Sequence, residues 1–446
     1  MAERLVVIGG VAAGMSAAAK ARRTRKDLDI VVYEQSGFVA YGSCGFPYFI
    51  KGEIPRVEDL VARTPAQIAK QGIQARVRHR VRAIDPTAQT IRVENLETGE
   101  EFADRWDRLV LATGGAASRP PIPGLGLPGI FTLRTVEDAV AIRRWLTERR
   151  PRRGVIVGGG YIGLEMAEAL AAHGVELAVI EMLPQVLPNL DAEMAAHAQE
   201  ALARQGVALR LGRAVQAFEG CGRVEWVVAG EERLPADVVI LSIGVRPSAA
   251  LAKEAGIPLG HTGAVRVDDR QRTSRANVWA AGDVAEARHL VTGDPAYVPL
   301  GTTANKQCKV AGANAAGGDE VFPGIVGTAV VKLFDLTLAQ TGLTETRARE
   351  AGRDAAAVTI TANSRASYMP GSAPLHVKLV YDRGSQRILG AQMVGTDGVA
   401  KRIDVLAAAL HAGWTTRDLS ELDLAYAPPF APVWDPILVA ANAANR

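Results

Sequence analysis

A single cysteine stands in the segment YGSCGFPYF, residues 41–49, in a setting that suits redox chemistry. Cys44 lies between small residues and is followed by aromatic residues and a proline, which can open a helix. A thiol at a helix N-terminus has a lowered pKa, and its thiolate attacks sulfur in other molecules. The alternative is that Cys44 is a small buried apolar residue, as free cysteines often are. The other two cysteines, Cys221 and Cys308, lie far away along the chain.

A glycine turn near the N-terminus has the pattern of a dinucleotide-binding unit. Residues 4–23 read as a buried strand, a turn and an alanine-rich helix, and a strand at 30–34 ends in Glu34. Gly9 allows the tight turn and Gly14 lets helix and strand pack closely, while Val11 replaces the middle glycine of the usual pattern. The helix N-terminus would face a pyrophosphate, and Glu34 would accept hydrogen bonds from a ribose. Alone, the turn could also be an ordinary strand–helix connection.

A second glycine turn indicates that the chain binds two dinucleotides. Residues 154–174 carry the full G-x-G-x-x-G pattern at Gly158, Gly160 and Gly163, and the next strand ends in Glu181. A carboxylate at this strand end, with no arginine directly after it, favours NADH over NADPH because a 2′-phosphate would meet a negative charge. The alternative is that Glu181 is a solvated residue at the end of a strand.

Composition and charge exclude several other classes of protein. The chain has 446 residues and a formal net charge of +3, which gives no support for a nucleic-acid surface. Three irregularly spaced cysteines exclude a disulfide framework and indicate a reducing compartment, and neither cysteines nor histidines have metal-ligand spacing. The sequence shows no signal peptide and no apolar run of membrane-spanning length. We therefore predict a cytoplasmic protein without a metal site.

Three further segments repeat a strand followed by small residues, at 108–115, 238–247 and 277–285, and the last contains Asp283. With the two glycine turns in this order, the chain resembles the flavin-dependent pyridine nucleotide–disulfide oxidoreductases over nearly its whole length. The resemblance implies an α/β fold with two Rossmann-like units, for FAD and NADH, and a C-terminal α+β dimerisation domain. The implied boundaries are 1–115 and 245–322 for the FAD domain, 116–244 for the NADH domain and 323–446 for the dimerisation domain of a homodimer.

The resemblance also implies which residues contact the two cofactors, with Asp283 at the ribityl chain of FAD. These residues are Gly9, Gly10, Ala12, Ala13, Gly14, Glu34, Gln35, Ser43, Val81, Ala112, Thr113, Gly114, Gly158, Gly160, Tyr161, Ile162, Gly163, Glu181, Gly244, Asp283, Thr302 and Ala304.

Two departures place the chain in a single-cysteine branch of the family. Dithiol members carry C-x4-C, but the positions five residues from Cys44 are Val39 and Phe49, and no histidine occurs in residues 424–436. Peroxidases and water-forming oxidases of this branch carry a histidine in the first glycine turn, where this chain has Ala12. The chain therefore resembles the coenzyme A disulfide and persulfide reductases, in which the substrate provides the second sulfur.

That branch implies a mixed disulfide between Cys44 and coenzyme A, with Tyr368 and Tyr426 reaching the site from the other subunit. Ser16, Lys20 and Arg23 are spaced i, i+4, i+7 on one helix face and, with Ser43, match positions that bind coenzyme A. The alternative for this basic stripe is a solvated helix end that complements the helix dipole. Two alternative functions remain: an NADH oxidase or peroxidase that cycles Cys44 as a sulfenate, and a redox-sensing flavoprotein.

Overall fold

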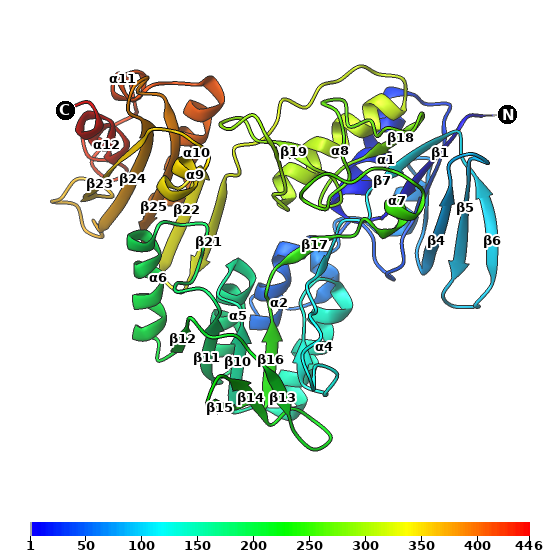
Figure 1. Ribbon diagram of the computed structural model, residues 1–446, viewed down its shortest axis with the longest axis horizontal. Coiled ribbons are helices and arrows are strands. Elements are labelled where there is room, and N and C mark those ends of the chain that lie inside the picture. Colours follow the sequence, from blue (N-terminus) through cyan, green and yellow to red (C-terminus); the bar gives the residue numbers. More distant parts are fainter. Residues whose placement is uncertain (1) are drawn as a thin grey trace.

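The computed structural model describes residues 2–446, which form three sheet-based units (Figure 1). The first unit has a five-stranded parallel sheet in the order β18-β7-β1-β2-β3. Successive residues of its central strand point into separate apolar cores on the two faces, Leu5 and Val7 into one and Val6 and Ile8 into the other. The strands are β1 (Arg4–Ile8), β2 (Asp29–Tyr33), β3 (Ile73–Arg76), β7 (Arg108–Leu111) and β18 (Val278–Ala280).

Two helices that are distant in sequence lie side by side on one face of this sheet, α1 (Ala12–Thr24) and α8 (Gly301–Ala315). Their contact is close because a Cβ atom on Gly312 would lie 2.2 Å from the carbonyl oxygen of Ala17. A three-stranded antiparallel sheet and a short helix cover the other face. These elements are β4 (His79–Asp85), β5 (Thr90–Asn95), β6 (Glu101–Arg105) and α7 (Ala250–Glu254).

The second unit repeats this plan with a parallel sheet in the order β12-β11-β10-β16-β9. Its strands are β9 (Ile130–Phe131), β10 (Arg153–Val157), β11 (Glu176–Glu181), β12 (Ala208–Leu211) and β16 (Val238–Leu241). Its helices are α4 (Val136–Arg149), α5 (Tyr161–Ala171) and α6 (Ala192–Arg204), and a small antiparallel sheet consists of β13 (Ala217–Glu219), β14 (Trp226–Ala229) and β15 (Glu232–Pro235).

The chain passes between these two units along a two-stranded antiparallel ribbon, in which β8 (Gly115–Ala117) pairs with β17 (Val245–Pro247). The boundaries predicted at 115/116 and 244/245 fall on this ribbon, and the division of the chain into four segments stays a prediction. Two short strands follow in the first unit, β19 (Ala287–Arg288) and β20 (Pro295–Ala296).

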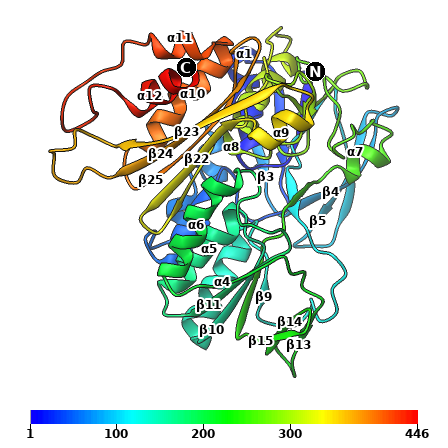
Figure 2. The ribbon, with the colours of Figure 1, turned by 60° about the vertical axis from the view of Figure 1, so that its left-hand side comes forward.

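The third unit is a five-stranded antiparallel sheet in the order β21-β22-β25-β24-β23, with helices packed on it (Figure 2). α5 of the second unit contacts the edge strand β21, and α6 contacts the inner strands β22 and β25. Buried Lys378 lies 3.0 Å from the carboxylate of Asp191 at the start of α6. The strands are β21 (Ala329–Leu333), β22 (Leu336–Gly342), β23 (Ala355–Asn363), β24 (Pro374–Asp382) and β25 (Ile388–Gly395). The helices are α9 (Glu345–Glu350), α10 (Val399–Ala412), α11 (Thr416–Ser420) and α12 (Pro436–Ala444).

The predicted fold class is confirmed, with two Rossmann-like units and a C-terminal α+β unit. Within residues 2–446, no helix combines the length and apolar character that crossing a bilayer requires.

Candidate active site

Cys44 lies in a short turn where the first two units meet. Residues Ser43–Gly45 form a single 3₁₀ turn, and α2 (Phe46–Lys51) follows directly. α2 packs between α4 and α5 of the second unit, so the thiol is held at the junction of the two parallel-sheet units (Figure 1). Cys44 is exposed and unpaired, whereas Cys308 is buried in α8 and Cys221 lies in the β13–β14 turn.

The pKa of the Cys44 thiol is raised, which contradicts the lowering expected from a helix start. The main cause is that the surrounding protein removes water from the thiol, which disfavours the charged thiolate. Part of the residue is nevertheless open to solvent. The carboxylate of Glu165 on α5 raises the pKa further, and Arg134 and a hydrogen bond with Ser43 lower it only partly. Burial and the neighbouring Glu168 raise the pKa of Glu165 itself to about 7. α2 has fewer than two turns, so its dipole is too small to reverse these effects.

The predicted flavin aspartate, Asp283, pairs with an arginine that sequence reasoning missed. Arg134, between β9 and α4, donates from Nη2 to Asp283 Oδ2 at 2.5 Å and from Nε to the carbonyl oxygen of Gly115 at 2.9 Å. Tyr297 lies beside Gly115, and among residues 2–446 its buried hydroxyl has no hydrogen-bond partner. Burial and the charge of Asp283 raise the pKa of Tyr297, so the hydroxyl stays protonated as a donor.

The two predicted ribose-binding glutamates occupy equivalent positions in the first two units. Glu34 accepts hydrogen bonds from the backbone N–H groups of Gly10 at 2.7 Å and Ser36 at 2.8 Å. Glu181 accepts them from Gly159 at 2.6 Å and Leu183 at 2.9 Å. Each carboxylate thus ties the glycine turn to the end of the second strand, and both are buried.

The glycine turns themselves have the close approaches that the pattern predicts. Gly9 and Gly158 have φ values of +106° and +105°, and a Cβ atom on Gly14 would lie 1.7 Å from the carbonyl oxygen of Gly9. Gly160 has open space where its Cβ would be. Neither α1 nor α5 has a side chain that caps its first N–H groups, so these donors are free for phosphate oxygens.

The other predicted cofactor residues lie around these turns with unequal exposure. Tyr161 and Ile162 open α5, and burial raises the pKa of Tyr161 to about 12. The backbone after β7 and β16 turns at Gly114 and Gly244, both with positive φ. Ala12 and Ala13 lie in the first turn of α1, and Thr302 and Ala304 lie in the first turn of α8. Val81 in β4 and Ala112 are buried, whereas Gln35 is exposed. The hydroxyl of Thr113 donates to the carbonyl oxygen of Ser248 at 2.8 Å.

These features fit FAD in the first unit and a nicotinamide nucleotide in the second. The unpartnered hydroxyl of Tyr297 and the open position at Gly244 are the features of this chain that a bound flavin would fill. Tyr297 and Arg134 follow no recognisable motif, so no sequence signal marked them.

The basic stripe is on α1 as predicted, but two of its three residues have partners on distant segments. Ser16 Oγ donates to Oδ1 of Asn305 on α8 at 2.7 Å, and Lys20 Nζ lies 2.6 Å from Oε1 of Glu320. Arg23 is exposed. The basic charge available on this face is therefore smaller than the sequence implies.

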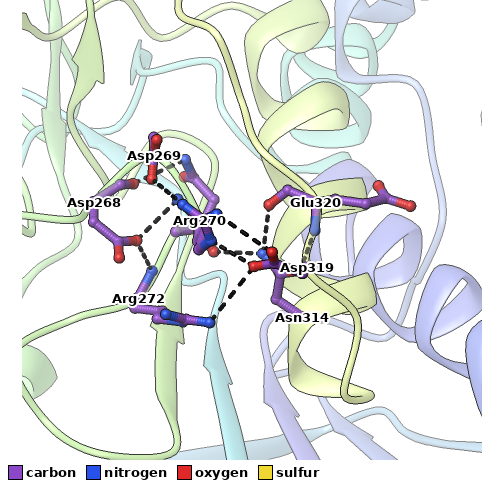
Figure 3. Close-up of polar contacts among 8 residues, drawn as sticks. Asp268, Asp269, Arg270, Arg272, Asn314, Asp319 and Glu320 are labelled. Atoms are coloured by element: carbon purple, nitrogen blue, oxygen red, sulfur yellow. Dashed lines mark hydrogen bonds and ion pairs between the residues drawn. The ribbon is translucent and has the colours of Figure 1, made fainter.

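Glu320 is held at the edge of a polar network that follows α8 (Figure 3). Its backbone N–H donates to Asn314 Oδ1 at 2.7 Å and its carbonyl oxygen accepts from Asn314 Nδ2 at 2.8 Å. Asn314 Nδ2 also donates to the carbonyl oxygen of Arg270, whose guanidinium contacts Asp319 at 2.6 Å. These bonds fix the backbone of Glu320, and its carboxylate lies 2.6 Å from Lys20 Nζ.

The two predicted catalytic tyrosines are neighbours on the third unit. Tyr368 is 72% exposed and Tyr426 is 48% exposed, and a hydrogen bond between their hydroxyls raises the pKa of Tyr426. Phe430, Val433 and Trp434 are also exposed. We call these five residues the aromatic surface.

A buried carboxylate that the sequence did not reveal connects all three units behind Cys44. Glu168 on α5 accepts from Lys51 Nζ of α2 at 2.8 Å, from Lys332 Nζ of β21 at 2.6 Å and from the backbone N–H of Phe334 at 2.7 Å. These bonds lower the pKa of Glu168 against the effect of burial. The helix that follows Cys44 is thereby fixed to the second and third units.

Two parts of the chain match one family of enzymes. Residues 3–314 match the pyridine nucleotide-disulphide oxidoreductases, and residues 328–436 match their dimerisation domain. The chain belongs to this family. Family membership makes it an oxidoreductase, implies FAD and NAD(P)H as cofactors and confirms the resemblance seen in the sequence.

Individual relatives match over nearly the full chain. The NAD(P)H coenzyme A polysulfide/persulfide reductase of Pyrococcus horikoshii is 42% identical over 444 residues, covering 99% of this chain and 98% of that protein. The NADH oxidase of Methanocaldococcus jannaschii is 35% identical and covers 99% of both chains. The structure of reduced CoADR-RHD from Bacillus anthracis matches with a TM-score of 0.97 at 36% identity, covering 100% of this chain and 80% of that chain.

Proposed function

We propose that this protein is an FAD-dependent, NAD(P)H-driven reductase of coenzyme A disulfide, coenzyme A persulfide or polysulfide, with Cys44 as its redox residue. The observation that carries the proposal is one accessible, unpaired thiol at the junction of the two dinucleotide units. Of the other two cysteines, Cys308 is buried in α8 and Cys221 lies in the β13–β14 turn. A thiol in this position needs a sulfur from the substrate to complete a disulfide. The names of several full-length relatives support coenzyme A as the carrier of that sulfur.

The chemistry that this chain supplies is thiol exchange at Cys44. FAD, when bound, would accept hydride from NADH and provide two electrons for reduction of the sulfur–sulfur bond. The Cys44 thiolate attacks one sulfur of coenzyme A disulfide. The attack forms a mixed disulfide between Cys44 and coenzyme A and releases the other coenzyme A as a thiolate. Two electrons and two protons then restore the Cys44 thiol and release the second coenzyme A thiol. With coenzyme A persulfide, attack on the outer sulfur releases coenzyme A thiolate and leaves a Cys44 persulfide. Two electrons and two protons then restore the Cys44 thiol and release hydrogen sulfide.

A homodimer would complete the site through the aromatic surface. Tyr368 and Tyr426 are exposed on the unit that matches a dimerisation domain, where they would face Cys44 of the partner subunit. A tyrosine hydroxyl is protonated at neutral pH, so that of Tyr426 can donate a proton to a leaving thiolate. The alternative is that both tyrosines are only interface residues with satisfied hydroxyls.

Glu181 should make NADH the better electron donor. Its buried carboxylate is fixed by Gly159 and Leu183, and a 2′-phosphate would place a second negative charge beside it. Because like charges in contact are strongly unfavourable, we expect kcat/KM for NADH to exceed that for NADPH by about tenfold or more. Glu181→Gln keeps an acceptor for Gly159 and should narrow this ratio, whereas Glu176→Gln, at the exposed start of the same strand, should leave it unchanged. Equal kcat/KM values in the wild-type enzyme would contradict the assignment.

The basic stripe should contribute to coenzyme A binding. Loss of a charge-assisted hydrogen bond corresponds to about 1.5–3 kcal/mol, so Arg23→Ala should raise KM for coenzyme A disulfide roughly tenfold. Lys20→Ala should have the smaller effect because Lys20 already contacts Glu320. Reduction of a small neutral disulfide should change little in either variant. If steady-state kinetics show the same KM for both variants and wild type, the stripe is only a solvated helix end.

Two measurements separate the proposed function from its two alternatives, mass spectrometry of the isolated protein and NADH-dependent turnover of the disulfide. Mass spectrometry of the intact, non-reduced protein should show a coenzyme A adduct on Cys44 that a reductant removes. A relative named as an NADH oxidase supports that alternative, which instead expects addition of oxygen at Cys44. Ala12 argues against peroxide chemistry because it cannot act as a base. A redox sensor would lack rapid NADH-dependent turnover of the disulfide, and that result together with no adduct would overturn the proposal.

A further inference from the structure

Two histidine rings are stacked where the second unit meets the third. His197 of α6 and His376 of β24 have ring centroids 4.1 Å apart and ring planes inclined by 23°. Both residues are half-buried, and Nδ1 of His376 lies 2.9 Å from the hydroxyl oxygen of Thr361 on the neighbouring strand β23. The stack is therefore a contact between two units, and the chemistry at Cys44 does not use it.

A buried ion-pair cluster joins the same two elements beside the stack. Lys378 follows the histidine of β24 by two residues, so both side chains lie on one face of the strand. Its Nζ lies 3.0 Å from Asp191 and 2.8 Å from Glu345, and it also contacts Glu193 of α6. Against the effect of burial, these carboxylates raise the pKa of Lys378, and hydrogen bonds lower the pKa of Asp191. The Lys378–Asp191 pair therefore keeps its charges when histidines titrate.

The other ionisable groups near the stack belong to α6 and β24. The strands β22, β23 and β25 of the same sheet carry no ionisable side chain. On α6, Glu193 and Glu200 flank His197 at helical spacing, and Glu200 lies 4.0 Å from Arg204. The side chain of Glu200 is 64% exposed, so this carboxylate offsets little of the charge that two imidazolium rings would carry.

The strength of the stacked contact depends on pH. Neutral imidazole rings stack favourably, whereas two charged rings at this distance repel each other. Removal of water lowers the pKa of His376 and the neighbouring His197 lowers it further, with Glu200 opposing them. An ordinary histidine has a pKa of about 6.5. The contact is therefore complete above that pH, and its contribution to the docking of α6 is lost as the pH falls toward the lowered pKa of His376.

The segment that precedes α6 connects this helix to the nucleotide turn of the second unit. Asn189, two residues before the N-cap Asp191, donates from Nδ2 to the hydroxyl oxygen of Tyr161. Tyr161 begins α5 and directly follows Gly160 of the G-x-G-x-x-G turn. The N–H of Asp191 donates to Oε1 of Gln392 on β25 at 2.8 Å. Displacement of α6 would therefore disturb the start of α5, where the nicotinamide nucleotide is expected to bind.

We propose that His197 and His376 form a pH-sensitive latch, which holds α6 against the third unit at neutral pH and releases it in acid, and that nucleotide binding in the second unit opposes the release. The ion pairs of Lys378 persist in acid, so the release is a local movement of α6 and not unfolding of the unit. The inference goes beyond the proposed function and does not depend on the sulfur acceptor, because the family itself implies NAD(P)H.

Hydrogen exchange of the FAD-loaded protein measures the release directly. After correction for the intrinsic pH dependence of exchange, protection of the α6 amides in wild type should fall about tenfold or more between about pH 7.5 and about pH 5, because each unit of pKa difference between docked and released states changes the equilibrium tenfold. ADP-ribose is the nucleotide probe, since it has no hydride to give to the flavin. At about ten times its Kd, it should restore protection in acid about tenfold.

Variants of the two histidines test whether the latch is responsible. His197→Phe keeps a ring for stacking but cannot become charged, and His376→Gln keeps a polar partner for Thr361. Both should show wild-type protection of α6 at neutral pH and little loss in acid. His197→Lys carries a charge at either pH and should already show low protection at neutral pH. His261→Gln is the matched control, because it removes an exposed histidine of the first unit that lies 3.9 Å from Glu286, and it should keep the wild-type pH dependence.

The possible outcomes are distinct. Equal protection of α6 at both pH values in wild type would overturn the inference. An unchanged pH dependence in His197→Phe and His376→Gln would also overturn it, because the titrating groups would then lie elsewhere. If ADP-ribose leaves the protection in acid unchanged, the connection to the nucleotide site is wrong. Because these measurements include no sulfur acceptor, they succeed or fail independently of the proposed function.

Discussion

Replacement of Cys44 by serine should reduce turnover of coenzyme A disulfide or persulfide to less than about one thousandth of the wild-type rate. The serine hydroxyl ionises too poorly to attack sulfur and cannot form a disulfide. It is close in size to the thiol, so the 3₁₀ turn and α2 should persist. Bound FAD should still be reduced by NADH, because that half of the reaction requires no thiol. Anaerobic stopped-flow absorbance of the flavin, followed by steady-state thiol release, measures the two halves separately.

The matched control is Cys221→Ser, which removes an exposed thiol from the β13–β14 turn. This variant should behave like wild type in both halves of the reaction. Rapid flavin bleaching without thiol release in the Cys44 variant supports the proposed role. Coenzyme A disulfide reduction by Cys44→Ser at the wild-type rate would remove Cys44 from the mechanism and refute the single-cysteine assignment.

Replacement of Gly9 by alanine should abolish FAD binding and strongly destabilise the first unit. Gly9 has a φ of +106°, and its new Cβ atom would lie 2.1 Å from the carbonyl oxygen of Ala112. Backbone strain and forced overpacking together correspond to about 4 kcal/mol or more, a large part of the stability of a typical domain. We expect a protein that lacks flavin absorbance and melts about 10 °C or more below wild type.

Gly317→Ala distinguishes the clash from backbone strain alone. Gly317 has a φ of +96°, close to that of Gly9, but no atom lies within 4 Å of its Cβ position. This variant should therefore keep its FAD and show only the loss of about 1–3 kcal/mol expected for the unfavourable φ. A Gly9→Ala protein that retains FAD and the wild-type Tm would show that the glycine turn is not the tightly packed site described here.

The sequence was sufficient to predict the features that depend on local backbone geometry. A strand, a glycine with positive φ and an uncapped helix follow one another in the chain, so Gly9, Gly158, Glu34 and Glu181 could be placed without tertiary information. The third unit was expected only from the resemblance to the family, and the structure has an antiparallel sheet with helices there. The comparisons confirm the family and fold class to which these patterns point. The assignments of individual site residues stay predictions.

Only the tertiary structure showed which groups surround the predicted residues. Arg134 reaches Asp283 across 149 positions, and the three units meet at Glu168 through lysines that are 117 and 164 positions away. Neither residue belongs to a motif, because its role comes from packing between units and not from its neighbours in the chain.

Electrostatic properties were the least predictable feature, because charge and hydration depend on everything that lies nearby in space. The stripe on α1 was correctly placed on one face, but the packing of α1 against α8 brings Glu320 to Lys20 and leaves less free basic charge. The pKa of Cys44 was expected to be lowered by its helix, and the surrounding protein and Glu165 raise it instead.

The sequence alone determined the dinucleotide units and the lone thiol, since both follow from local residue types. The partners and charge of the site were decided by the fold, since electrostatic interactions act through space between segments that are distant in the chain.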